Sequence, residues 1–338
     1  MNIWQRSSTP KSSGKIILPL GGALCLALFF VYLLVGSSEI DVMEAIAEIA
    51  TGDIRTNGSI LLYVRLPRAL AACFSGAALS VSGVMIQAVL NNAMASPSII
   101  GVNAGAGFGV SLVAALFPAA VTLIPIAAFA GAALTGFLIY LIAAKTGASR
   151  ITITLTGIAV SSLLTALMSG VKALFPDTAY NLSSFSVGGL SGISVRTLSI
   201  SGVGILICLA LAIIFSKKID ILALGEDTAH SLGMNVPMTR LLLLALSGAL
   251  AGLAVSFAGL IGFVGLVIPH ITRRLVGTRH TLLLPASALL GASFVLVCDT
   301  LSRILFAPYE LPTGILLSLI GAPFFIAIIF SSRGKLYD

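Results

Sequence analysis

Residues 16–36 read IILPLGGALCLALFFVYLLVG, a stretch without a charged side chain. A helix needs about 20 mostly apolar residues to cross a lipid bilayer, and this stretch is long enough. Comparable stretches recur to the C-terminus, so that 58% of the 338 residues are apolar and only 9% are charged. Backbone groups in lipid must pair within the protein, which leaves helix bundles and closed barrels. Because the stretches lack the alternating pattern of β-strands, the sequence predicts an all-α polytopic membrane protein.

About ten transmembrane helices are predicted by the length criterion. The candidate spans are 16–36, 68–90, 97–117, 121–144, 151–171, 198–216, 240–259, 261–276, 281–301 and 311–330. The span 261–276 is short and is interrupted by Pro269. The first span follows three basic residues, as a secretory signal does. It is longer than the usual apolar core of about 7–15 residues, and no clear cleavage site follows it, so we expect it to stay uncleaved.

Lys and Arg set the expected orientation, because cytoplasmic loops carry an excess of both. With the N-terminus inside, thirteen of the 19 Lys and Arg residues are cytoplasmic and six are outside: Arg55, Arg65, Arg68, Lys172, Arg196 and Arg303. Both termini are therefore predicted to be cytoplasmic. The predicted organisation is a tail over 1–15, a single transmembrane domain over 16–330 with a cytoplasmic loop over 217–239, and a second tail over 331–338.

Composition and motif spacing argue against several functions. The net charge is +7, but the basic residues stand singly between apolar spans and do not form the basic face of a nucleic-acid-binding protein. The four cysteines lie inside apolar spans without C-x-x-C pairing, and the three histidines lack metal-ligand spacing. The sequence also lacks the common catalytic motifs and a Walker A motif. We therefore expect no catalytic residue, no metal site and no cofactor in this chain.

Three connections are long enough to carry a function. The outer connection 37–65 is acidic; Ser38 and Asp41 resemble a capping box, and Gly52 is suited to end a short helix. The outer connection 172–196 is rich in Ser and Gly. The cytoplasmic connection 217–239 mixes apolar and polar residues around Gly225, which favours two short helices. Their apolar side must rest on lipid or on a partner, and the low net charge favours a protein partner.

Polar groups within the predicted spans are few. Gln87, Asn91 and Asn92 lie near the inner end of the second span, and Asp299 and Arg303 stand one helical turn apart near the outer end of the ninth. That spacing allows an ion pair, with either a structural or a functional role. A proton- or sodium-coupled transporter usually needs more buried carboxylates. If ATP drives transport, the missing Walker A motif places hydrolysis on another subunit.

Small residues recur at close spacing, as in Ser75-Gly76-Ala77-Ala78 and over 101–107. Such residues allow helices to approach closely. Ser75-Gly76-Ala77 and Ser247-Gly248-Ala249 lie in spans of opposite direction in the two halves of the chain. This similarity indicates an inverted repeat, which is common in transporters.

Several motifs resemble the FecCD-type permease family, the membrane subunits of bacterial ABC importers for iron-siderophores, haem and vitamin B12. The resemblance begins with RLPR at 65–68, GAAL at 76–79 and GVMIQ at 83–87, and it continues through LGE at 224–226 to LG at 232–233. It is strongest in GFVGLVIPH at 262–270 and LPASAL at 284–289, and it closes with ELPTG at 310–314 and IGAPFF at 320–325. It covers nearly everything after the first span.

The resemblance implies a type II ABC importer permease fold that pairs with a second copy or a paralogue. Two cytoplasmic ATPases, which hold ATP and Mg, are expected to dock below, and an extracytoplasmic binding protein to deliver the substrate. The residues implied in ATPase coupling are Leu224, Gly225, Glu226, Ala229, Leu232 and Gly233.

The resemblance also assigns docking and gating residues. Arg65, Arg68 and Arg303 match outward-facing arginines that meet acidic residues of the binding protein. Pro67 favours a helix start between the first two, which would present both charges at the outer surface; an arginine pair that anchors the helix at the lipid headgroups is the alternative. The gate and translocation path carry over onto Gln87, Asn92, Met94 and Ser149. The usual Asn-Pro-Leu-Ala of the family reads Asn92-Ala93-Met94-Ala95 here, so the rigid turn imposed by Pro is missing.

Ferric siderophore is the expected substrate, moved across the inner membrane of a bacterium, with haem, cobalamin or an oxyanion as alternatives. An ion-coupled secondary transporter with broken helices is a rival class. A membrane receptor or scaffold without transport is another. Binding of a cytoplasmic ATPase subunit would separate the ABC permease from both.

Overall fold

The computed structural model describes residues 14–36, 40–145, 149–307 and 309–333. The predicted tails at 1–15 and 331–338 lie mostly outside these residues, as does Ser38 of the predicted capping box. Within the described residues the regular structure is helical, without any strand. The predicted all-α fold is confirmed.

Ten helices correspond to the ten predicted spans. They are α1 (Gly14–Leu34), α4 (Leu66–Leu90), α5 (Val102–Leu116), α6 (Ile124–Lys145), α7 (Arg150–Leu174), α9 (Val195–Ile214), α12 (Val236–Ala258), α13 (Val264–Val276), α14 (His280–Ile304) and α15 (Thr313–Arg333). Among the described residues, seven helices are long and apolar enough to cross a bilayer, and α5 and the first part of α15 are shorter apolar helices. Helix α13 is the span that the sequence marks as short and interrupted by Pro269.

The second membrane helix starts further upstream than the sequence predicts. The helical backbone is continuous from α3 (Thr56–Ser59) through the π-helical turn η2 (Ile60–Arg65) into α4. In this turn the N–H of Leu66 bonds to Leu61 O, five residues back. A wider turn suits Pro67, because proline has no N–H to offer and clashes with a normal preceding turn. Pro67 therefore does not start the helix.

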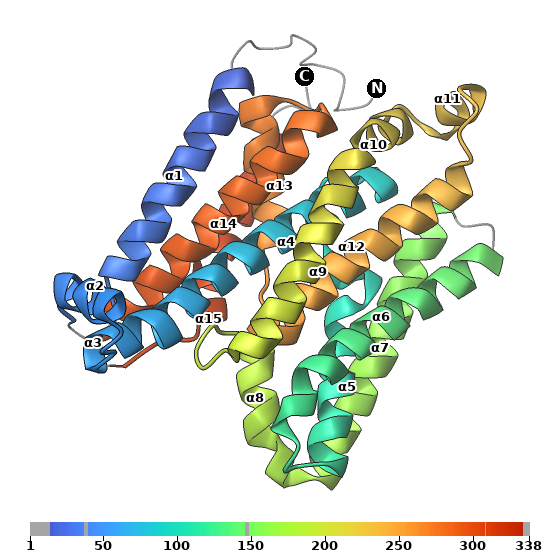
Figure 1. Cartoon of the computed structure of the whole chain (residues 1–338). Coiled ribbons are helices and arrows are strands. Elements are labelled where there is room, and N and C mark those ends of the chain that lie inside the picture. Colours follow the sequence, from blue (N-terminus) through green and yellow to red (C-terminus); the bar gives the residue numbers. More distant parts are fainter. Residues whose placement is uncertain (1–13, 37–39, 146–148, 308, 334–338) are drawn as a thin grey trace.

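Helix α4 lies at the centre of the bundle and packs against α12, α13 and α14 (Figure 1). Small residues bring these helices close together. A Cβ at Gly76 would collide with the carbonyl of Gly291 on α14, and a Cβ at Gly83 would collide with that of Gly265 on α13. The predicted role of small residues in close helix packing is confirmed.

The two halves of the bundle meet where α4 crosses α12. Ser82 Oγ donates to the carbonyl of Ser247 (2.8 Å), and Ser247 Oγ can donate in return to the carbonyl of Ser82 (3.0 Å). Helix α4 packs on α13 and α14, and α12 packs correspondingly on α5 and α6. This reciprocity supports the inverted repeat, with a different register: Ser247-Gly248 pairs with Ser82-Gly83, seven residues beyond the Ser75-Gly76 that the sequence suggests.

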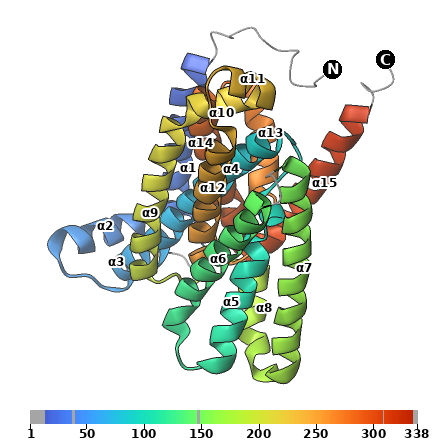
Figure 2. The same ribbon diagram turned by 90° about the vertical axis from the view of Figure 1, so that its right-hand side faces the viewer.

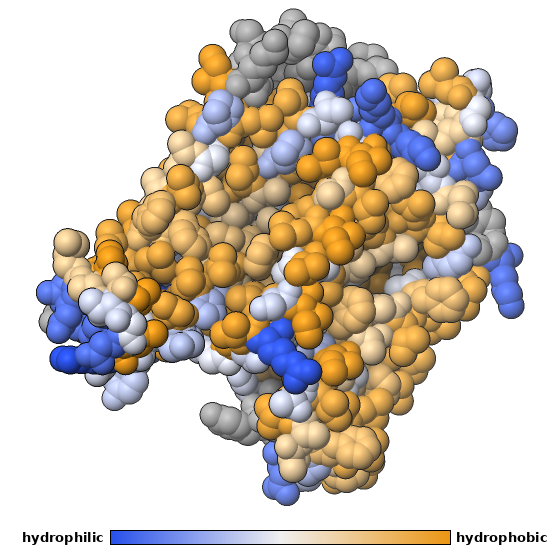
Figure 3. Space-filling model, viewed as in Figure 1, coloured by the Kyte–Doolittle hydropathy of each residue, from blue (hydrophilic) through white to orange (hydrophobic). Residues whose placement is uncertain are grey.

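The short helices lie at the two ends of the bundle (Figures 1 and 2). Helices α2 (Val42–Thr51), α3 and α8 (Ala179–Val187) lie at one end, and α10 (Ser216–Ala223) and α11 (Glu226–Ser231) lie at the other, together with the start of α1 and the end of α15. Apolar side chains cover the middle of the face in Figure 3, and hydrophilic ones gather toward the ends. This distribution suits a bundle that crosses a membrane with α10 and α11 on the same side as the start of α1 and the end of α15 (Figures 1 and 2).

The outer connection contains the short helix that the sequence predicts. Asp41 caps α2 by accepting hydrogen bonds from the N–H groups of Met43 (2.9 Å) and Glu44 (3.1 Å). Gly52 ends the helix with φ of 76°, a conformation that glycine adopts readily.

Candidate functional sites at the two ends of the bundle

A cluster of polar side chains, here called the outer polar network, joins four elements near the outer end of the bundle. Its members are Tyr32 of α1, Arg68 of α4, Asp299 and Arg303 of α14, Glu310 in the connection before α15, and Thr313 of α15. Asp299 is completely buried, and both arginines are at most 7% exposed. A buried charge is tolerated only where charge partners and hydrogen bonds satisfy it.

Asp299 is the centre of this network. Arg68 donates to both of its oxygens, from Nε to Oδ2 (2.9 Å) and from Nη2 to Oδ1 (3.1 Å). The hydroxyl groups of Tyr32 and Thr313 each donate to the carboxylate at 2.5 Å. The two-pronged geometry of Arg68 is the strongest common form of an arginine–carboxylate contact.

Arg303 reaches the same carboxylate from one helical turn away. Its Nε lies 3.7 Å from Asp299 Oδ2, and its guanidinium carbon lies 4.0 Å from the centre of the Tyr32 ring. The predicted Asp299–Arg303 pair is therefore present. The closer partner, Arg68, lies 231 residues away in sequence, and Arg68 also donates to Glu310 Oε2 (2.7 Å). The sequence offered no local signal for either contact.

Arg65 serves a different helix end. Its Nη1 donates to the carbonyls of Leu33 (2.7 Å) and Leu34 (3.0 Å), which are among the last carbonyls of α1 and lack partners within that helix. The expectation that Arg65 and Arg68 present two charges at the surface is wrong in this chain, because they are only 3% and 7% exposed. Arg303, at 3%, is equally buried. Arg65 and Arg68 are buried because the helix that carries them begins further upstream, at α3, and packs on α1 and α14.

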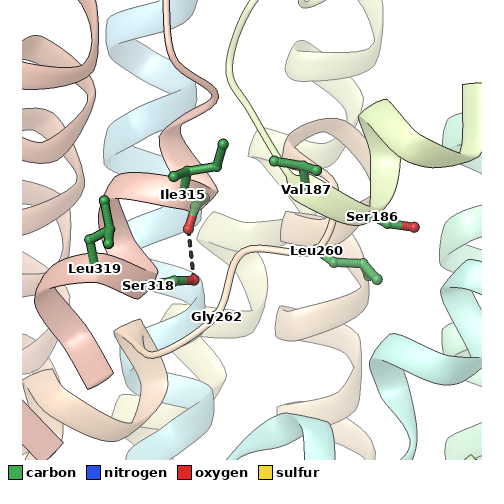
Figure 4. Close-up of a pocket in the computed structure, with 8 residues that line it drawn as sticks. Ser186, Val187, Leu260, Gly262, Ile315, Ser318 and Leu319 are labelled. Carbon is green, nitrogen blue, oxygen red and sulfur yellow. Dashed lines mark hydrogen bonds between the residues drawn. The ribbon is translucent and has the colours of Figure 1, made fainter. Parts of the chain in front are cut away.

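Two cavities open near this end. One, of about 250 Å³, is lined by Arg68, Glu310 and residues 190–193. The other, of about 450 Å³, lies where α8, the α12–α13 connection and α15 meet (Figure 4). Ser186, Ser318 and backbone groups supply its polar lining, and Ser318 Oγ donates to the carbonyl of Gly314 (2.8 Å). No charged side chain is among its lining residues, so it suits a ligand whose outer surface carries little charge.

At the opposite end, residues 216–235 form what we call the elbow: α10, α11 and the turn into α12. The two predicted short helices are present, separated by Gly225, whose φ is 114°. Ile219, Leu222 and Ala229 are completely buried against the bundle. Leu224 and Leu232 point outward, 65% and 62% exposed. Exposed leucines beside charged residues, beyond the apolar belt, are a feature of surfaces that bind another protein.

Two carboxylates tie the elbow to the bundle. Glu226 accepts a hydrogen bond from Arg240 of α12, and its Oε1 lies 3.4 Å from Arg150 Nε at the start of α7. The hydrogen bond from Arg240 lowers the pKa of Glu226, although burial partly opposes the shift. Asp220 accepts from the backbone N–H of His280 (2.9 Å) and pairs with its Nδ1 (2.7 Å). Burial opposes ionisation of Asp220, but these contacts with His280 outweigh it and lower the pKa of the carboxyl.

The predicted gate residues fall into two groups. Asn92 and Met94 are exposed in the turn after α4, and Ser149 is exposed where it caps α7 by accepting from the N–H of Thr152 (3.1 Å). Asn91, with φ of 48°, and the bond from Met94 N–H to Asn92 Oδ1 (2.9 Å) shape the turn where the family has proline. Gln87 is buried instead, accepting from Arg273 Nη1 (2.5 Å) of α13. It packs between helices in this chain, and its place on a translocation path stays a prediction.

Comparisons with known proteins agree with this architecture. Residues 24–331 match the model of the FecCD transport family. The chain is 36% identical over 305 residues to the Fe(3+)-citrate import system permease protein YfmD of Bacillus subtilis (strain 168), covering 88% of this chain and 90% of that relative. It is 39% identical over 268 residues to the cobalamin import system permease protein BtuC of Halobacterium salinarum, covering 79% and 72%. A solved structure assigned to the metal-chelate type of ABC transporter, in an inward-facing conformation, superposes with a TM-score of 0.81 at 30% identity, covering 94% of this chain and 99% of that chain.

Proposed function

This chain belongs to the FecCD transport family, and we propose that it moves a ferric siderophore across the inner membrane of a bacterium. At a coarser level it is a multi-pass permease of a metal-chelate-type ABC importer. Such a permease works with a substrate-binding protein and with separate subunits that hydrolyse ATP, so the chain itself is a membrane subunit and not an enzyme.

The share of each chain that aligns supports a ferric siderophore over cobalamin as the cargo. Percentage identity does not distinguish the candidates, since the cobalamin relative is as similar as the iron-citrate relative. The iron-citrate relative, however, aligns over 88% of this chain and 90% of its own length, against 79% and 72% for the cobalamin relative. The uncharged lining of the 450 Å³ cavity supports a cargo whose metal charge is enclosed by its chelator.

The elbow supports a cytoplasmic ATPase as partner. Its buried face holds it on the bundle, and Leu224 and Leu232 remain available to a second protein. An ATPase dimer that holds ATP and Mg would bind there and convert hydrolysis into movement of the helices. Gly225 and Gly233 have φ of 114° and 79°, so larger residues at either turn would distort the surface offered to this partner.

A second permease copy or a paralogue would complete the pathway. Helix α7 exposes Ile151, Leu155 and Ile158 on one side, at a spacing that places them on a single helix face. A partner permease would cover part of this face and lipid the rest. The cargo would then pass between the two permeases, beside the exposed turn that holds Asn92 and Met94.

Docking of the binding protein at the outer end stays part of the proposal, with a revised route. Arg68 borders the 250 Å³ cavity together with Glu310. An acidic side chain of the binding protein would approach Arg68 through that cavity and compete with Glu310 for it. Arg65 and Arg303 would not contact the binding protein directly; they would hold α1 and Asp299 in place behind Arg68.

Transport assays with the assembled importer test the cargo. The permease, its ATPase and its binding protein are reconstituted in liposomes, and uptake of radioactive iron is compared for ferric siderophores, ferric citrate and haem, with cobalamin assayed separately. We expect ATP-dependent uptake of a ferric siderophore. ATP-dependent uptake of cobalamin or haem alone would contradict the proposed cargo, and uptake driven by an ion gradient without ATP would overturn the ABC mechanism.

A further inference from the structure

The elbow is attached at two separate points, and each reaches a different part of the bundle. Asp220 lies on α10 and contacts His280, the first residue of α14. Glu226 opens α11 and contacts Arg240 of α12 and Arg150 of α7. The elbow thus touches the half formed by α4–α7 and the half formed by α12–α15.

The Asp220 contact fixes α10. One carboxylate oxygen accepts both from the backbone N–H of His280 and from its imidazole, with the Nδ1–H tautomer as donor. That backbone N–H lies in the first turn of α14, where helices lack internal acceptors. Ile219 and Leu222 are buried beside it, and α10 packs against α4 and α14. Polar and apolar contacts together hold α10 firmly.

The Glu226 contact reaches the element next to the gate. A single carboxylate oxygen pairs with buried Arg240 and with Arg150, which is the first residue of α7. Ser149, a predicted gate residue, is the cap of that helix. A displacement of α11 would therefore pull on Arg150 and move the start of α7. A salt bridge of this kind also depends on geometry, so it can be made or released as the elbow shifts.

We propose that Glu226 is a positioning residue that links the elbow to the start of α7, so that movement of the elbow shifts the gate residue beside it. The inference rests on the proposed function, because it takes the elbow to be the ATPase-binding surface. It goes beyond that function by assigning Glu226 an intramolecular partner, Arg150. If Glu226 acted only by touching the ATPase, Arg150 would have no part in coupling.

A double-mutant cycle in the reconstituted importer tests the link, with ferric siderophore molecules imported per ATP hydrolysed as the readout. We expect Glu226→Gln and Arg150→Gln each to lower this ratio about tenfold, within the range known for residues that share one ion pair. The double variant should be no worse than Glu226→Gln alone, because that change already removes the link to Arg150. The amount of ATPase that copurifies should stay within about twofold of the unmodified complex, since the outward leucines are intact.

Two further variants separate positioning from simple structural support. Glu226→Asp keeps the charge and should recover most of the ratio. Asp177→Asn, which changes an exposed carboxylate in the connection before α8 at the opposite end of the bundle, should leave the ratio unchanged. Additive losses in the double variant, or a normal ratio in Arg150→Gln, would overturn the inference.

A readout that needs no transported cargo distinguishes failure of the link from failure of the proposed function. A cysteine introduced at Ser149, the exposed gate residue beside Arg150, is labelled with a membrane-impermeant maleimide, with and without ATP and vanadate. Labelling in the otherwise unmodified complex should depend on nucleotide, and this dependence should be lost in Glu226→Gln and Arg150→Gln. Retention of the dependence in both variants contradicts the link. Its absence in the unmodified complex, or failure of the ATPase to bind at all, contradicts the proposed function instead.

Discussion

The outer polar network and the elbow contain similar kinds of residues in opposite arrangements. Around Asp299 the charged groups are buried and find their partners within the chain, from α1, α4 and α14. In the elbow, Leu224 and Leu232 are exposed and Glu226 is partly exposed. Buried charges that find their partners within the chain need no second protein, and the loss of one member leaves another charge buried without compensation. Exposed apolar residues beyond the membrane belt indicate a partner that is absent from a single chain.

Removing the central carboxylate should have the largest effect. We expect Asp299→Ala to destabilise the permease by about 3–5 kcal/mol, because Arg68 and Arg303 would lose the anion that balances them in a buried site. Thermal unfolding of the protein in detergent measures the loss. Asp227→Asn, an exposed carboxylate change at the elbow, is the control and should leave the midpoint unchanged. A midpoint for Asp299→Ala within 2 °C of the parent would show that the network does not hold the bundle.

Arg65 should have the next largest effect. Its guanidinium is buried and donates to two carbonyls at the end of α1, so Arg65→Ala should cost about 1.5–3 kcal/mol of folding free energy. The combined reversal Arg65→Glu and Arg68→Glu would place one carboxylate against the carbonyls of Leu33 and Leu34 and another against Asp299 and Glu310. We expect that chain to fail to assemble. If the complex with both reversals assembles normally and loses only its affinity for the binding protein, both arginines act as surface docking residues and this prediction is wrong.

The elbow should respond in the opposite way. Replacing Leu224 and Leu232 by serine should change the unfolding free energy by no more than about 0.5 kcal/mol per site, because both side chains are exposed. The same pair of changes should strongly reduce the amount of ATPase that copurifies, since apolar anchors dominate small interfaces. Ile46→Ser, at an exposed position of α2 at the opposite end of the bundle, is the matched control. Normal ATPase binding together with a loss of stability would show that Leu224 and Leu232 support the fold and do not bind a partner.

The smallest effect is a dependence of stability on pH. The contacts with His280 hold the pKa of Asp220 below its usual range. Its contribution to stability is therefore complete above the unfolded-state pKa of about 3.9 and is lost as pH falls through the lower folded-state value. The difference in melting midpoint between the parent and Asp220→Asn should shrink as the pH falls below 4. A difference that shrinks between pH 8 and pH 5 would assign the effect to another group.

The sequence predicted the elements better than their ends. The apolar stretches and the lysine and arginine distribution were sufficient for ten helices and for placing the start of α1 and the end of α15 on the same side (Figure 1), because length and hydropathy are local properties. The start of the second membrane helix was misplaced at Pro67. The π-helical turn that accommodates this proline lies against α1, and the helix that follows it packs on α14; a local pattern does not report these contacts.

For the candidate sites too, local features could be predicted from the sequence, and contacts between distant residues could not. By itself the sequence determined a helical membrane protein, an elbow of two short helices around Gly225, and the end of α2 at Gly52, since these follow from composition and glycine conformations. Asp41 caps α2 in the structure, whereas the predicted capping box began at Ser38 and placed Asp41 inside the helix. Only the tertiary structure decided that Arg68 belongs to Asp299, that Ser82 meets Ser247, and that Glu226 reaches Arg150. Each of these pairs joins residues at least 76 positions apart. Contacts of that kind are set by how helices cross in three dimensions, and the spacing of residues along one helix carries no record of them.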